Sequence, residues 1–137
     1  MKKLKILLIE DDQIEVLKLK RALGRIGNVH EIIEASNGEE ALEILGSKTD
    51  LPDLIFLDLN MPKINGLDFL KILRDDDVLC YLPTVILTTS GNRKDVMDCY
   101  RAGVAGYILK PLKYDEYVNK IKKTLDYWGV NELIKAT

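Results

Sequence analysis

The sequence predicts an α/β protein in which helices cover both faces of a parallel sheet. Short, nearly continuous apolar runs alternate with longer stretches of helical periodicity along the chain, and there are five of each. Turn-forming pairs such as Asn37-Gly38 and Asn65-Gly66 separate them. The length of 137 residues and the hydrophobic fraction of 47% indicate a single domain, residues 1–137, with its own core.

Each apolar run is expected to form a strand of a parallel sheet. Strands buried on both faces are continuously apolar, whereas half-exposed strands alternate polar and apolar residues. The runs here are of the continuous kind and are rich in Leu, Ile and Val. In chain order, the predicted strands are 4–9, 29–35, 54–57, 84–87 and 106–109.

The segments between the strands are expected to be helices that turn one apolar stripe to the sheet. The first carries Val16, Leu19 and Leu23 at helical spacing. Asp12 precedes it as an N-cap, and Glu15 follows three residues later, which is the spacing of a capping box. In chain order, the predicted helices are 13–25, 38–45, 66–74, 94–102 and 114–127.

Composition excludes several classes of function. The net charge of −2 offers no basic surface for nucleic acid. No apolar run approaches the ~20 residues of a membrane span, and acidic residues 10–12 interrupt the first run too early for a signal peptide, so a cytoplasmic location is expected. Cys80 and Cys99 lack metal-site spacing and are expected to be small buried hydrophobes. The single histidine, His30, is expected to be a paired surface residue, and it leaves no two-histidine metal site.

Charged residues follow the strands at the edge where parallel sheets bind ligands. Glu10 and Asp11 follow the first strand, and Asp58 follows the third. Each pair of carboxylates ~4 Å apart costs about 4 kcal/mol at an effective dielectric near 20. A hard cation would offset that repulsion, and an all-oxygen site with few carboxylates suits Mg²⁺. Asp58 is then a candidate nucleophile for an acyl phosphate, with Lys110 and the hydroxyl of Thr88 as candidate phosphoryl contacts.

With these residues in place, the sequence resembles the receiver domain of two-component response regulators from about residue 4 to residue 127. The matching positions are Glu10-Asp11, Asp58 within the run Asp-Leu-Asn-Met-Pro, Thr88 and Lys110-Pro111. The resemblance implies a flavodoxin-like, doubly wound sheet of five parallel strands in the order 2-1-3-4-5, with five helices. It further implies that the Lys110–Pro111 peptide bond is cis.

The resemblance also assigns roles to the site residues. Asp58 is implied as the phosphoacceptor of a histidine kinase, with Thr88 as the switch residue and Tyr107 as its aromatic partner. Asp11 and Asp58 are implied as direct Mg²⁺ ligands together with the backbone carbonyl of Asn60, and Glu10 acts largely through water. Glu10 departs from the usual Asp, and Ser90 departs at a second position, where the family tunes acyl-phosphate lifetime.

Finer features resemble the small regulators that partner phytochrome-type histidine kinases. These are residues 87–90, Asp95-Val96 and Tyr127-Trp128. Five of the six tyrosines lie in the last 38 residues; Tyr117 shares a stripe with Ile121 and Leu125 and is expected to pack inside. The other aromatics predict a partner or homodimer surface on the fourth helix, fifth strand and fifth helix. The tail, residues 129–137, is too short for an output domain, so a stand-alone switch rather than an enzyme is expected.

Three other functions fit the sequence less well. A phosphatase of the haloacid dehalogenase type requires a second Asp two residues after its nucleophile, where this chain has Asn60. A flavodoxin-like flavin carrier requires a phosphate-binding loop where this chain has acidic residues 10–12. A receiver-like module that is never phosphorylated would not need the full set of site residues.

Overall fold

The computed structural model describes residues 3–27 and 29–134, and five parallel strands form its central sheet. The strand order is β2-β1-β3-β4-β5, as the sequence resemblance implied. The strands are β1 (Lys5–Ile9), β2 (Glu31–Ala35), β3 (Leu54–Leu57), β4 (Thr84–Thr88) and β5 (Gly106–Leu109). The helices are α1 (Gln13–Ile26), α2 (Gly38–Gly46), α3 (Gly66–Asp75), α4 (Arg93–Arg101) and α5 (Tyr114–Gly129), with a short 3₁₀ helix η1 (Leu79–Tyr81) before β4.

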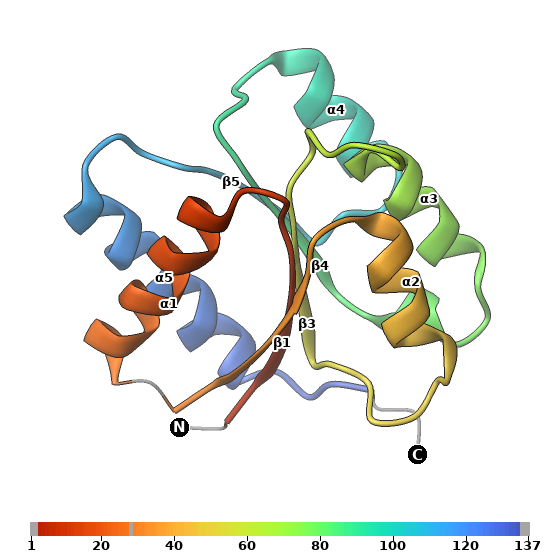
Figure 1. The fold of residues 1–137 in the computed structure, drawn as a ribbon, viewed down its shortest axis with the longest axis horizontal. Coiled ribbons are helices and arrows are strands. Elements are labelled where there is room, and N and C mark those ends of the chain that lie inside the picture. Colours follow the sequence, from red (N-terminus) through yellow and green to blue (C-terminus); the bar gives the residue numbers. More distant parts are fainter. Residues whose placement is uncertain (1–2, 28, 135–137) are drawn as a thin grey trace.

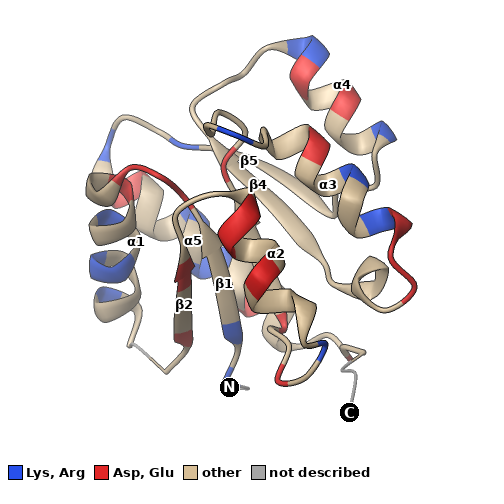
Figure 2. Ribbon diagram, turned by 45° about the vertical axis from the view of Figure 1, so that its right-hand side comes forward, with Lys and Arg blue, Asp and Glu red and all other residues tan. Residues whose placement is uncertain are grey.

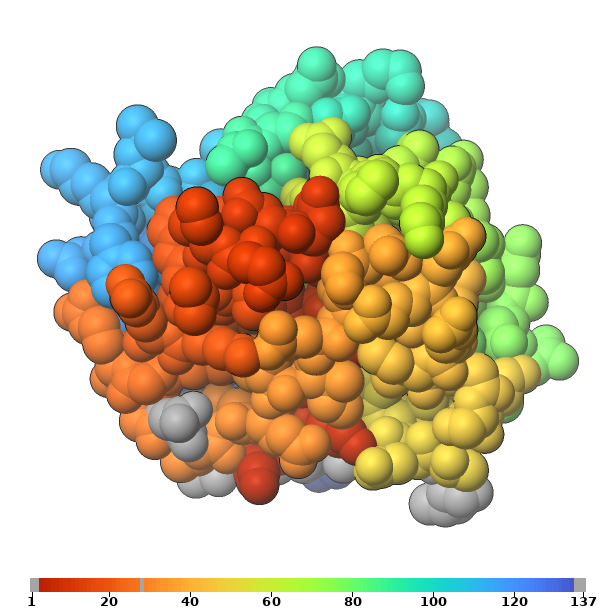
Figure 3. Space-filling view, in the orientation of Figure 1, coloured from red at the N-terminus to blue at the C-terminus, as the bar shows by residue number. Residues whose placement is uncertain are grey.

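The helices divide between the two faces of the sheet, as the two views of Figure 1 and Figure 2 show. Helices α1 and α5 pack together on one face, and α2, α3 and α4 cover the other. Each face has its own buried cluster, one around Phe56 and Tyr117 beneath α1 and α5, and one around Phe69 beneath α2 and α3. In the space-filling view of Figure 3, the central strands are largely hidden behind α1, β2 and α2.

The strand predictions were confirmed for the centre of the sheet and corrected at its edges. Every residue of β3 and β4 is buried, as continuous apolar runs predict. The edge strands β2 and β5 are mostly half-exposed, because each has a neighbouring strand on one side only. β2 also begins at Glu31 rather than at Val29, which is 47% exposed. The helix η1 was not predicted, because three residues are too few for a periodic pattern.

His30 is buried, with only 7% of its surface exposed, so the prediction of a surface histidine was wrong. Its Nδ1 accepts a hydrogen bond of 2.9 Å from the backbone N–H of Leu4, which precedes β1. Burial lowers the pKa of His30, partly offset by the charge of Asp126. The imidazole therefore packs at the amino-terminal ends of the strands, at the edge of the sheet opposite the acidic residues.

Two further predictions concern local chemistry. The described residues contain no cis peptide bond, so Lys110–Pro111 is trans and the cis expectation was wrong; the preference between the two forms of an X–Pro bond is only about 1 kcal/mol, and residue types alone do not decide it. Both cysteines are free; Cys99 is buried as predicted, whereas Cys80 is partly exposed.

Among the described residues, no helix has the length and apolarity to span a membrane. In the predicted tail, α5 continues to Gly129, and residues 135–137 lie outside the described part.

Candidate functional site

The register of the sheet brings the acidic residues together. Ile9 of β1 lies between Ala35 and Leu57, so the next residues on β1 and β3, Glu10 and Asp58, leave the sheet side by side. The pairing continues one step beyond the strands, because the N–H of Asp58 donates to the carbonyl of Ile9 at 3.1 Å. The carboxyl ends of two central strands therefore point their first polar residues into one space.

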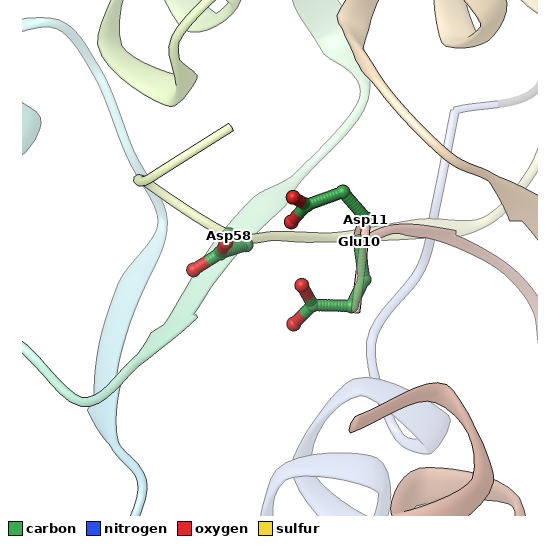
Figure 4. Close-up of side chains that lie close together, drawn as sticks. All are labelled: Glu10, Asp11 and Asp58. Atoms are coloured by element: carbon green, nitrogen blue, oxygen red, sulfur yellow. The ribbon is translucent and has the colours of Figure 1, made fainter. Parts of the chain in front are cut away.

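Three carboxylates converge in that space. One oxygen each from Glu10, Asp11 and Asp58 lies within 4.8 Å of the other two, and the side chains of Glu10 and Asp11 both extend toward Asp58 (Figure 4). Glu10 is buried, Asp58 is half-buried and Asp11 is exposed. The prediction that these three residues meet is confirmed.

Burial and mutual repulsion disfavour charge on the two inner members of the cluster. Burial raises the pKa of Glu10 and the charge of Asp58 raises it further, while Lys110 acts in the opposite direction. Burial also raises the pKa of Asp58, and Asp11 adds to that effect. The ammonium of Lys110 and the backbone N–H groups of Asn60 and Leu59 partly restore the preference of Asp58 for its charged form. One described cation, Lys110, therefore acts on a cluster of three carboxylates.

Lys110 is the only lysine or arginine that the described structure pairs with Glu10. Lys110 directly follows β5. The pairing between β5 and β4 continues to this residue, because its N–H donates to the carbonyl of Thr88 at 2.7 Å. Its side chain is only 6% exposed, and its Nζ lies 3.1 Å from Glu10 and 2.8 Å from Glu15. Burial pulls the pKa of Lys110 down, but the two carboxylates together outweigh burial and hold it above the ordinary value. The lysine is a buried cation at the edge of the acidic cluster.

The loop between β3 and α3 carries Asp58 and depends on one glycine. A Cβ at Gly66 would lie 2.6 Å from the carbonyl oxygen of Asp58 and 2.8 Å from the Cα of Leu59. The N–H of Gly66 donates to the carbonyl of Leu59 at 3.0 Å, which closes the loop. Gly66 was noted in the sequence only as a turn former; the close approach depends on the folded path of the loop.

The end of β4 is linked to β5 through one serine. Thr88 is buried, and its Oγ1 accepts a hydrogen bond from the N–H of Ser90 at 3.3 Å. The hydroxyl of Tyr107, on β5, donates to the carbonyl of Ser90 at 2.7 Å, and the hydroxyl of Ser90 donates to Asp95 of α4 at 2.7 Å. Thr88 and Tyr107 were predicted as partners, and they meet on the same loop residue. The hydrogen bond between Ser90 and Asp95 was not predicted.

The donor set of the cluster suits a hard divalent cation. All three side chains offer carboxylate oxygens, and no described His or Cys joins them. Hard cations of the Mg²⁺ type take oxygen ligands and keep several waters, which an exposed residue such as Asp11 permits. A cation here would also relieve the repulsion that raises the pKa of Asp58. The residues therefore fit the metal that the sequence predicted.

Comparison with known proteins agrees with this geometry. Residues 6–122 match the response regulator receiver domain family. The chain belongs to this family. The receiver is 34% identical to the chemotaxis protein CheY1 of Helicobacter pylori over 94% of this chain and 100% of that protein. It is 32% identical to the probable methanogenesis regulatory protein FilR2 of Methanothrix harundinacea over 90% of this chain and 82% of that protein.

Solved structures resemble the receiver over nearly its whole length. The phosphorylated cyanobacterial phytochrome response regulator RcpA superposes with a TM-score of 0.87 at 31% identity, covering 96% of this chain and 98% of the other. The Mn²⁺-bound form of the response regulator Rcp1 superposes with a TM-score of 0.85 at 28% identity, covering 97% and 99%. The predicted likeness to phytochrome-associated regulators is confirmed, and the receiver is a signalling domain of two-component systems.

One prediction at this site was wrong in part. Asp12 caps α1 as expected, because its side chain accepts from the N–H of Ile14 at 2.9 Å. The N–H of Asp12, however, donates to Glu10 at 3.2 Å, and no hydrogen bond to Glu15 appears there. Glu15 turns instead toward Lys110. The capping box is therefore only half formed, because a buried cation offers Glu15 a stronger partner than a backbone N–H.

Proposed function

We propose that this receiver accepts a phosphoryl group on Asp58 from a histidine kinase in a Mg²⁺-dependent reaction. The observation that carries the proposal is the convergence of Glu10, Asp11 and Asp58 beside the buried ammonium of Lys110. Such a cluster is unfavourable for stability alone. It suits a site that binds a cation and then stabilises an incoming phosphoryl group.

The proposed metal ligands are Asp11, Asp58 and the backbone carbonyl of Asn60, with Glu10 acting through water. When bound, Mg²⁺ supplies positive charge to both the carboxylates and the phosphoryl oxygens. A carboxylate oxygen of Asp58 attacks phosphorus, the P–N bond to the kinase histidine breaks, and its electron pair and a proton remain on the imidazole. The product is an acyl phosphate, and hydrolysis returns the carboxylate and inorganic phosphate.

The remaining roles belong to residues at neighbouring strand ends. The ammonium of Lys110 pairs with the phosphoryl oxygens. The hydroxyl of Thr88 donates to one of these oxygens. Because a hydroxyl can donate and accept at the same time, a movement of Thr88 toward the phosphoryl group can carry Ser90 with it through the hydrogen bond that Thr88 accepts. Because the hydroxyl of Tyr107 donates a hydrogen bond to the carbonyl of Ser90, a movement of the loop after β4 also moves the side chain of Tyr107 on β5. This is the proposed path from the phosphoryl group to the surface.

The proposed output surface lies on α4, β5 and α5. It exposes large apolar side chains from all three elements: Met97 at 46%, Tyr100 at 52%, Leu109 at 42% and Tyr127 at 59%. Single exposed apolar residues are ordinary, but several from adjacent elements favour a protein contact. We propose that phosphorylation changes association through this surface, including homodimer formation, without direct binding to nucleic acid or membrane.

The likeness to the phytochrome response regulator RcpA supports a phytochrome-type histidine kinase as the phosphodonor. A cytoplasmic location follows from the proposed partner. Phosphotransfer from purified kinases of phytochrome and chemotaxis type, compared by rate, tests this assignment.

The central test is intact-mass spectrometry after incubation with acetyl phosphate. We expect one added phosphoryl group, dependent on Mg²⁺ and lost in Asp58→Asn. The matched control is Asp12→Asn, which keeps a good N-cap for α1 and alters a carboxylate adjacent to the cluster. Addition without Mg²⁺, or addition that survives Asp58→Asn, contradicts the proposal.

A further inference from the structure

Glu15 holds the ammonium that the phosphoryl chemistry needs. It lies in the first turn of α1, and its Oε1 is 2.8 Å from the Nζ of Lys110, closer than the 3.1 Å that separates Lys110 from Glu10. The side chain of Lys110 is 6% exposed and that of Glu15 is 22% exposed, so the pair is largely shielded from water. This contact crosses from α1 to the end of β5.

The position of Glu15 is set by the folded structure rather than by local helix chemistry. At N3 of α1, a glutamate ordinarily folds back on the N-cap N–H, but here Glu10 occupies that donor. Glu15 also lies 3.9 Å from the Nζ of Lys18, one turn further along α1. Lys18 in turn lies over the ring of Tyr117 on α5, 5.1 Å from its centroid. Glu15 thus lies between the buried Lys110 and the half-buried Lys18.

An ammonium that serves a phosphoryl group on Asp58 has to share or leave its carboxylate partners. Glu10 belongs to the acidic cluster and stays beside the phosphoryl group in any case. Glu15 lies outside the cluster, because among the residues that the structure describes it is Glu10, Asp11 and Asp58 whose oxygens lie within 4.8 Å of one another. A hydrogen bond between Lys110 and Glu15 therefore competes with the contact between Lys110 and the phosphoryl oxygens.

We propose that Glu15 is a positioning residue that retains Lys110 on the α1 side of the site and releases it when a phosphoryl group arrives. This inference rests on the proposed function, and it assigns a regulatory role at the same site to a residue that contacts neither metal nor phosphoryl group. The release has a structural consequence. Once Lys110 moves, the other described lysine paired with Glu15 is Lys18, 3.9 Å away, so phosphorylation also changes the ion pairs of α1.

Beryllofluoride with Mg²⁺, an acyl-phosphate mimic, measures the competition by calorimetric titration. Glu15→Gln should bind the probe about three- to fivefold more tightly than wild type; the effect is modest because Glu10 still pairs with Lys110 in the variant. Glu15→Asp should restore affinity toward wild type. Asp115→Asn is the matched control, because Asp115 also lies in a first helical turn and pairs with a cation of another element, Arg25. Its affinity should be unchanged.

A second measurement needs neither metal nor phosphoryl group. The side-chain nitrogen resonance of Lys110 should shift in Glu15→Gln and remain in place in Asp115→Asn. Probe affinity that is equal or weaker in Glu15→Gln overturns the inference, as does an unmoved Lys110 resonance. Failure of wild type to bind beryllofluoride would contradict the proposed function instead, and the Lys110 resonance would still report whether Glu15 holds the lysine.

Discussion

Replacing Asp11 with asparagine should stabilise the protein in the absence of metal and abolish its stabilisation by Mg²⁺. Asp11 is the exposed member of a cluster whose three carboxylates approach within 4.8 Å. In the folded state these charges repel one another, and in the unfolded chain they separate. Asparagine keeps the size of the side chain and removes one charge. The substitution therefore exchanges a functional charge for stability, as is common at strained sites.

The expected gain follows from the separation of the charges. Coulomb's law gives about 3.5 kcal/mol for two unit charges 4.8 Å apart at an effective dielectric near 20. Solvent around Asp11 screens this strongly, and Lys110 already neutralises part of the charge on Glu10. A net gain of about 1 kcal/mol remains, which corresponds to a rise of roughly 3 to 5 °C in the melting temperature of a domain of this size.

Thermal melts in EDTA and in Mg²⁺ test both halves of this prediction. Wild type should gain about 2.7 kcal/mol when Mg²⁺ reaches a hundred times its Kd, and Asp11→Asn should gain little. The control Asp12→Asn removes a neighbouring charge that caps α1 outside the cluster, so it should keep the response to Mg²⁺. If Asp11→Asn melts below wild type in EDTA, or gains as much from Mg²⁺, Asp11 is not a ligand in a repulsive cluster.

Three further perturbations probe other parts of the molecule. Gly66→Ala should lower the free energy of unfolding in urea by at least about 2 kcal/mol and reduce phosphorylation of Asp58, because its Cβ would lie 2.6 Å from a backbone oxygen. The control Gly24→Ala has no neighbour within 4 Å of its Cβ and should be neutral or stabilising. Equal effects of the two substitutions on stability would refute the argument. Since burial lowers the pKa of His30 in the folded state, the unfolded chain binds the proton more readily, and the free energy of unfolding should fall as pH drops below ~6.5; an identical pH profile in His30→Gln would count against this. Tyr107→Phe loses its bond to the loop after β4, so backbone NMR shifts caused by beryllofluoride should spread less into residues 100–117 than in wild type, and an unchanged spread would exclude this path.

Much of the candidate site was predictable because its residues follow strands whose identity is local. A run such as 54–57 is apolar throughout, so the residue after it, Asp58, is predictably at the edge of a parallel sheet. The same reasoning brought Glu10 and Asp11 to that edge. Glu15 was not predictable as a partner of Lys110, because the two residues are 95 positions apart and their contact depends on how α1 packs.

The sequence by itself determined the alternation of strands and helices, the acidic residues at the strand ends and the resemblance to receivers, because each depends on periodicity or on residues close along the chain. Only the tertiary structure decided the half-exposed edge strands, the burial of His30, the close approach at Gly66 and the partner of Glu15. These depend on distances between segments far apart in sequence. Of all the groups that folding brings near it, a side chain pairs with the one that gives the lowest free energy. The local sequence pattern identifies only some of those groups.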